Sequence, residues 1–91
     1  MSRDERIRAC LTASFAPVML EIIDDSAKHA GHAARNGVAG GETHYRVTMV
    51  AAGMAGLSRL ARQRAVNEAL ATEFATGLHA LSLKLAAPEE V

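Results

Sequence analysis

Hydrophobic positions recur at helical spacing from the start of the chain. Residues 2–5 have the S-x-x-E form of a capping box, and Ile7 and Leu11 follow on one helical face. Pro17 disfavours helical backbone at the residue before it. Residues 2–14 are therefore predicted to form a helix.

Two strand-like segments follow this helix. Residues 18–25 form a short apolar run with β-branched side chains, and residues 43–51 alternate between apolar and polar positions. The apolar positions of the alternating segment are Tyr45, Val47 and Met49. Residues 26–41 contain several glycines and show no clean period, so they predict a long exposed loop. Across this loop the two strands are expected to pair antiparallel.

The second half of the chain predicts a helical crossover and a third strand. Ser58 is placed to cap the crossover helix, and Gly77 is a natural stop for it. Its broad apolar face would consist of Leu57, Leu60, Ala61, Val66, Leu70 and Phe74. Residues 78–85 alternate again, with His79 on the side of three leucines, and the strand ends before Pro88. A crossover of this kind makes the strands that it joins parallel.

These elements predict one α/β (α+β) domain over residues 1–91, with a three-stranded mixed sheet and helices on one face. Ten Lys and Arg balance ten Asp and Glu, and aromatic residues make up 3% of the chain, which disfavours binding to nucleic acid. The lone Cys10 excludes an internal disulfide and is expected in the core. With a charged start and no stretch that would span a membrane, we expect a cytoplasmic protein.

No arrangement of residues typical of an enzyme is present in the sequence. It contains no Ser-His-Asp order, paired acids typical of a catalytic pocket, glycine-rich phosphate loop or Cys-x-x-Cys motif. We therefore expect a protein without catalytic residues.

Four segments in order resemble the BolA family: residues 20–26, 41–47, 56–67, and 79–82 together with 88–90. This resemblance covers nearly the whole chain and implies an αββααβ domain similar to the class II KH fold. The chain departs from the family pattern at three positions. Gln63 stands where a histidine between two arginines is usual, Met54 where a bulky aromatic residue is common, and Val91 where the tail often ends in tryptophan.

The resemblance implies an adaptor that binds a monothiol glutaredoxin and shares a 2Fe-2S cluster with it, with no cluster expected in the isolated protein. Its role would be in iron–sulfur trafficking or in iron, redox or stress regulation. The family's cluster histidine corresponds to His79, and imidazole is a known cluster ligand. The alternative for His79 is a histidine at the edge of the core. The alternative for the whole protein is a DNA-binding transcriptional regulator that uses the KH-like fold.

The resemblance also implies a second ligand from the loop between the first two strands. His29 is the first candidate there and His32 the second, and the alternative is that both are solvated loop histidines. His44 is a weaker candidate, as a third ligand or as a residue that supports the ligands, because its place opposite Tyr45 on the alternating strand indicates an exposed strand residue. Together with His79, these are all four histidines of the chain.

Three arginines cluster at the start of the crossover helix, Arg59, Arg62 and Arg64, with Arg46 expected near them. They are candidates for docking a partner or for weak binding of DNA. The alternative is a solvated helix face offset by Glu68 and Glu73. The sequence leaves open which glutaredoxin binds, whether the cluster is transferred or sensed, and whether the free protein forms a homodimer.

Overall fold

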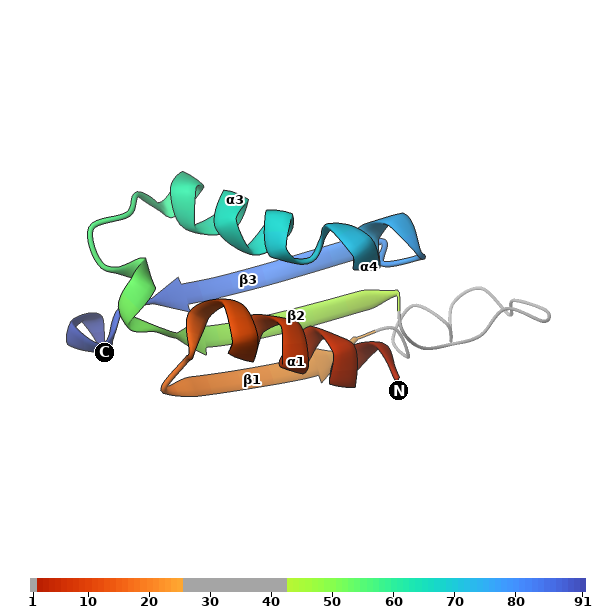
Figure 1. Cartoon of the computed structure of the whole chain (residues 1–91), viewed down its shortest axis with the longest axis horizontal. Coiled ribbons are helices and arrows are strands. Elements are labelled where there is room, and N and C mark those ends of the chain that lie inside the picture. The colour runs from red at the N-terminus through yellow and green to blue at the C-terminus, as the bar shows by residue number, and fades with distance from the viewer. Residues whose placement is uncertain (1, 26–42) are drawn as a thin grey trace.

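The computed structural model of the chain describes residues 2–25 and 43–91 and has the predicted αββααβ order (Figure 1). Its elements are α1 (Arg3–Phe15), β1 (Met19–Asp24), β2 (His44–Val50), the 3-10 turn η1 (Ala52–Met54), α3 (Arg59–Ala69), α4 (Ala71–Ala75), β3 (Ala80–Ala86) and the 3-10 turn η2 (Pro88–Glu90). The predicted loop 26–41 lies outside the described residues.

The three strands form one sheet in the order β1-β2-β3, so β2 is central. β1 pairs antiparallel with β2, with Ile22 opposite Val47. β3 pairs parallel with β2, with Leu83 beside Val47. The predicted mixed sheet is confirmed.

Helices α1 and α3 pack against the same face of this sheet (Figure 1). Tyr45, Val47 and Met49 of β2 are buried there, as the alternation predicts, and the core is completed by α1 and by the second half of the chain. The other buried apolar residues of this core are Ile7, Leu11, Ala51, Met54, Val66, Leu70, Leu78 and Ala87. Removing this apolar surface from water is the main force that holds so small a domain together.

The crossover differs from the single helix that the sequence predicts. It consists of α3 and α4, which meet at Leu70, where the backbone leaves helical geometry (φ −100°, ψ 17°). Of the predicted apolar face, Val66 and Leu70 are buried, but Leu57, Leu60 and Phe74 are exposed. Ser58 caps α3 as predicted and accepts a hydrogen bond from the N–H of Ala61 (3.1 Å).

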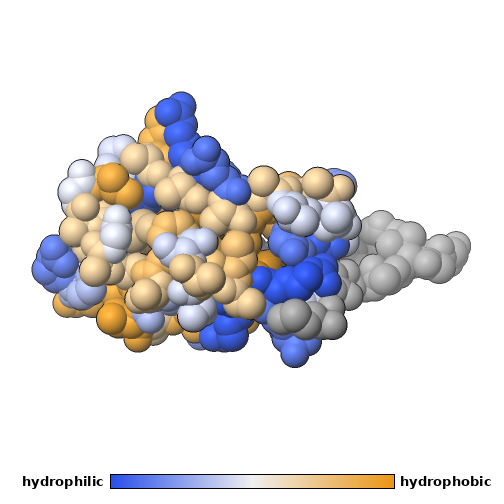
Figure 2. Space-filling view, in the orientation of Figure 1, coloured by the Kyte–Doolittle hydropathy of each residue, from blue (hydrophilic) through white to orange (hydrophobic). Residues whose placement is uncertain are grey.

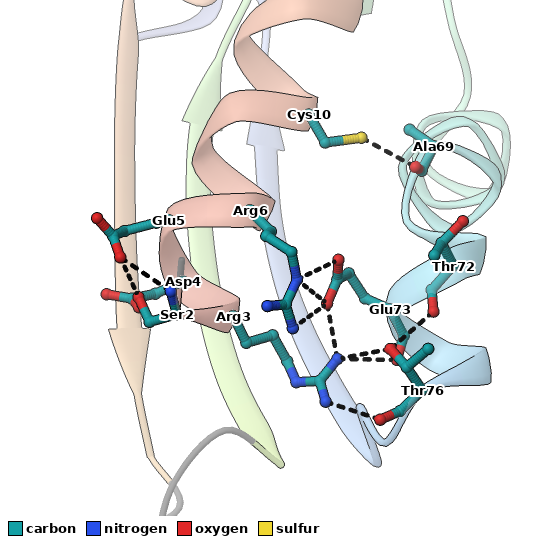
Figure 3. A network of polar contacts seen from close by, with 10 residues as sticks. All are labelled: Ser2, Arg3, Asp4, Glu5, Arg6, Cys10, Ala69, Thr72, Glu73 and Thr76. Atoms are coloured by element: carbon teal, nitrogen blue, oxygen red, sulfur yellow. Dashed lines mark hydrogen bonds and ion pairs between the residues drawn. The ribbon is translucent and has the colours of Figure 1, made fainter.

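A buried ion-pair network joins α1 to α4 (Figure 3). Arg3 and Glu73 are each 7% exposed, and Arg3 Nη1 donates to Glu73 Oε1 at 2.6 Å. Arg6 donates to the same carboxylate at 3.0 Å, and Arg3 also donates to the backbone oxygen of Thr76 at 2.9 Å. Hydrogen bonds from Arg6 and then Arg3 lower the pKa of Glu73, although burial opposes them. In the space-filling view, hydrophilic residues gather around the beginning of α1 (Figure 2).

At this network one sequence expectation changes and another is confirmed. Glu73 does not lie on a solvated face beside the arginines of α3, because it is buried and paired with α1 instead. Gly77 does end the crossover, with φ at 129°, and a Cβ at this position would lie 2.9 Å from Arg3 Nη2. Cys10 is half-buried at the edge of the core, where its thiol donates to the Ala69 carbonyl oxygen at 2.9 Å.

Candidate functional site

Two histidines meet at the end of the sheet where the parallel strands β2 and β3 begin. His44 is the first residue of β2, and its partner across the strands is Ala80, the residue after His79. The imidazole rings of His44 and His79 are stacked, with centroids 5.8 Å apart and planes inclined by 22°. His79 is exposed and His44 is half-buried, so His79 is not a histidine at the edge of the core.

The backbone explains why His79 leaves the leucine side of its strand. β3 begins only at Ala80, so the strict alternation that groups His79 with Leu81 does not extend to it. The N–H groups of both His79 and Ala80 donate to the carbonyl oxygen of Thr43, at 2.8 and 3.1 Å. Leu78, the residue before His79, is also held in place. It is buried, and its N–H donates to the Glu73 carbonyl oxygen at 2.8 Å.

The chain enters and leaves the segment 26–42 beside this histidine pair. The N–H of Asp25 donates to the His44 carbonyl oxygen at 2.8 Å, and Thr43 precedes His44 directly. A shallow hollow of about 300 Å³ adjoins His44. It is lined by Asp25, His44, Tyr45, Arg46, Ala80, Leu81 and Ser82.

The candidate loop ligands His29 and His32 lie outside the described residues. Among the residues that the structure does describe, no group of three or more His, Cys, Asp or Glu side chains is arranged to hold a metal ion. Within residues 2–25 and 43–91, the ring nitrogens of His79 form no hydrogen bond, so they remain open to a ligand from outside. An exposed imidazole with open nitrogens is suited to ligate iron in a cluster whose other ligands come from elsewhere.

The structure does not bring the four candidate arginines together. Arg46 lies on the face of β2 opposite α1 and α3, where its Nε contacts Asp25 Oδ2 at 2.9 Å. Arg59 and Arg64 are exposed on α3. The expectation that Arg46 joins the cluster of α3 is wrong, because alternation along β2 turns it away from the helices.

Arg62 is largely occupied by contacts within the chain. Its side chain is 12% exposed and binds the Glu90 carboxylate through two hydrogen bonds of 2.7 Å. It also donates to the carbonyl oxygens of Leu57 and Leu85, at 3.1 and 3.2 Å. Arg62 thus joins α3 to β3 and η2, at one side of a groove of about 420 Å³. This groove is lined by Leu57, Arg59, Arg62, Gln63, Leu83, Lys84 and Leu85.

Sequence reasoning overlooked Thr43, which contacts His79 through its backbone and His44 through its side chain. Its hydroxyl lies 2.9 Å from His44 Nδ1. Its position just before a histidine at a strand start is the only signal in the sequence, and that signal needs the register of the strands to be understood.

In the described ranges no helix is long and apolar enough to cross a membrane, and the cytoplasmic location stays a prediction.

Comparison with known proteins adds a family match. A family model described as BolA-like protein matches residues 11–90. A Sinorhizobium protein, "Uncharacterized protein in cobS 5'region", is 46% identical over 91 residues, which are 99% of this chain and 96% of the relative. "Protein BOLA1, chloroplastic" of Arabidopsis thaliana is 42% identical over 89 residues, 98% of this chain but only 56% of that protein.

A bacterial relative and a solved structure agree with this match. The "DNA-binding transcriptional regulator BolA" of Escherichia coli K12 is 40% identical over 79 residues, 87% of this chain and 70% of the relative. The solved structure of BolA1 from Arabidopsis thaliana superposes with a TM-score of 0.90 at 41% identity, covering 100% of this chain and 97% of that one. The fold of this chain is thus shared with a solved BolA1 structure.

Proposed function

This chain belongs to the BolA-like family, and from this premise we propose that it is a non-enzymatic adaptor that binds a monothiol glutaredoxin and helps to ligate a 2Fe-2S cluster shared by the two proteins. Its role would be in iron–sulfur cluster trafficking or in iron, redox or stress regulation. His79 would supply one ligand. His29 or His32 would supply a second.

The observation that carries this proposal is the exposure of His79 at the end of the sheet. A histidine in the core could reach a partner's cluster only if the strand came apart, whereas an exposed ring is available as it stands. The backbone of His79 is nevertheless fixed by its hydrogen bond to Thr43, so the ring projects from an ordered position. Rigid elements hold a ligand more reproducibly than loops do.

The shared cluster would supply one-electron redox chemistry, and its histidine ligation would raise its reduction potential relative to ligation by thiolates alone. The protein's own contribution would be a ligand on an ordered sheet end. A second ligand from residues 26–42 would be close, because Asp25 and Thr43, which flank that segment, both lie at the histidine pair.

The test is co-expression with a monothiol glutaredoxin, followed by iron analysis and visible absorption of the purified complex. We expect colour and iron in the wild-type complex and their loss with His79→Ala. The free His79→Ala protein should change in stability by less than about 0.5 kcal/mol, because the side chain is exposed. Asn67→Ala, an exposed position on α3, is the matched control. Unchanged iron content with His79→Ala would remove this residue from the ligand set.

A second candidate function is regulation of transcription by binding DNA. It is favoured by the name of the E. coli relative, a DNA-binding transcriptional regulator. The zero net charge of this chain opposes it, because phosphate neutralisation supplies most of the affinity of such contacts.

A further inference from the structure

The stacked histidines differ in what their nitrogens contact. His44 Nδ1 lies 2.9 Å from the hydroxyl of Thr43, which fixes the ring of His44 against its own strand. Within the described part of the chain, the ring of His79 stacks on His44 and forms no hydrogen bond. One ring is held by a neighbour, and the other is held only through the first.

Residues 43 and 44 therefore fix both the backbone and the side chain of His79. The carbonyl oxygen of Thr43 accepts hydrogen bonds from the N–H groups of His79 and Ala80. The ring of His44 then covers one face of the His79 ring, with a centroid distance of 5.8 Å that falls within the range of attractive aromatic pairs. A contact through the ring face leaves the nitrogens at the ring edge open.

We propose that His44 is a positioning residue for His79: it holds the His79 imidazole by stacking, with Thr43 orienting the stack, and is not itself a ligand. This inference rests on the proposed function, in which His79 ligates the shared cluster. An exposed histidine samples several rotamers, and ordering it when it binds costs free energy. The stack restricts the rotamers of His79 before the partner arrives.

Three substitutions separate positioning from ligation. His44→Phe keeps an aromatic ring for stacking but removes both nitrogens. His44→Ala removes ring and nitrogens together. Thr43→Val retains the backbone carbonyl and the branched shape of residue 43 but removes the hydroxyl that contacts His44 Nδ1. Each variant is first checked for cooperative thermal unfolding, so that loss of the fold is recognised separately.

The first measurement uses the free protein, residues 1–91, and needs no cluster. The His79 ring protons should show an upfield ring-current shift in NMR spectra of the wild type. This shift should persist in His44→Phe, disappear in His44→Ala and decrease in Thr43→Val. If the His79 ring protons have equal chemical shifts in the wild type and in folded His44→Ala, the two rings do not stack, whatever the cluster experiment shows.

The second measurement uses the complex with a monothiol glutaredoxin. We expect His44→Ala to lose iron on the order of tenfold faster than the wild type, the lower end of the effect of residues that orient metal ligands. His44→Phe should retain the cluster and its visible circular dichroism. If folded His44→Phe keeps the His79 ring shift but loses iron as His79→Ala does, His44 is a ligand and the inference is wrong. If His44→Ala keeps iron as the wild type does, the inference that His44 positions His79 is wrong.

The two measurements also separate this inference from the function on which it rests. A wild-type complex without iron would contradict the proposed function, while the ring shifts of the free protein would still decide whether His44 orders His79. If the iron content of the complex falls with His79→Ala but not with His44→Ala, the proposed function stands and the inference about His44 is wrong.

Discussion

Glu73 is a buried carboxylate at the centre of the network between α1 and α4. It accepts hydrogen bonds from Arg3 and Arg6, and Arg3 is itself buried. Glu73→Gln should destabilise the domain by about 3 kcal/mol, because removing one partner leaves a buried charge uncompensated. Urea unfolding at neutral pH, followed by circular dichroism, measures this loss. The control is Glu68→Gln at an exposed position of α3, for which we expect a change within about 0.5 kcal/mol.

The same residue gives the stability a dependence on pH. The folded pKa of Glu73 is lowered from 4.5, so its contribution is fully present above that value and is lost as the pH falls through the folded pKa. The wild type should therefore lose stability on acidification below about pH 4.5 more steeply than Glu73→Gln. Parallel acid profiles for the two proteins would contradict the ion pair.

At the scale of elements, the C-terminal turn η2 is held to α3 by one ion pair. Glu90 accepts two hydrogen bonds from Arg62 and a third from the N–H of Ala87 (2.8 Å). The Arg62 hydrogen bonds, followed by that of Ala87, lower the pKa of Glu90 to about 2. Because the folded pKa is lowered, the attachment is complete above pH 4.5 and weakens as the pH falls toward 2.

Glu90→Gln should therefore release η2 at neutral pH. We expect faster amide hydrogen exchange at residues 89–91 in NMR spectra, with the exchange of β2 amides unchanged. The wild type should approach the same behaviour as it is acidified from pH 4.5 toward 2. Glu89→Gln is the control, since Glu89 is the exposed neighbour on the same turn. Equal protection in wild type and Glu90→Gln would show that the turn is held by packing alone.

The same scale shows what the sequence could predict. Periodicity identified the helical and strand segments of the described chain, because one packed face of the sheet imposes a period on each element. It did not reveal the break at Leu70, since both sides of the break are helical. Periodicity also could not predict that Glu73 is buried. A glutamate is buried only where it has a partner, and its partner Arg3 lies some seventy positions away in the sequence. The meeting of His44 and His79 likewise depends on the parallel register.

At the scale of the whole molecule, the positive charges are dispersed. Arg46 pairs with Asp25 on the face of the sheet opposite α1 and α3, and Arg62 pairs with Glu90 beside η2. Exposed Arg59 and Arg64 remain on α3. The chain as a whole has zero net charge, so its total charge adds no attraction for phosphate to that of these two residues.

This distribution predicts weak binding to duplex DNA without sequence preference. The dissociation constant should be on the order of 10–100 μM at physiological salt, as for non-specific complexes. If Arg59 and Arg64 are the main phosphate contacts, the logarithm of the binding constant should fall with the logarithm of salt concentration with a slope of about −2. Fluorescence anisotropy over a salt series measures both quantities. Arg59→Gln combined with Arg64→Gln should remove most of this binding, whereas Arg46→Gln, on the other face, should leave it unchanged. Nanomolar binding that selects one sequence at physiological salt would contradict this expectation and place the regulator function ahead of the adaptor.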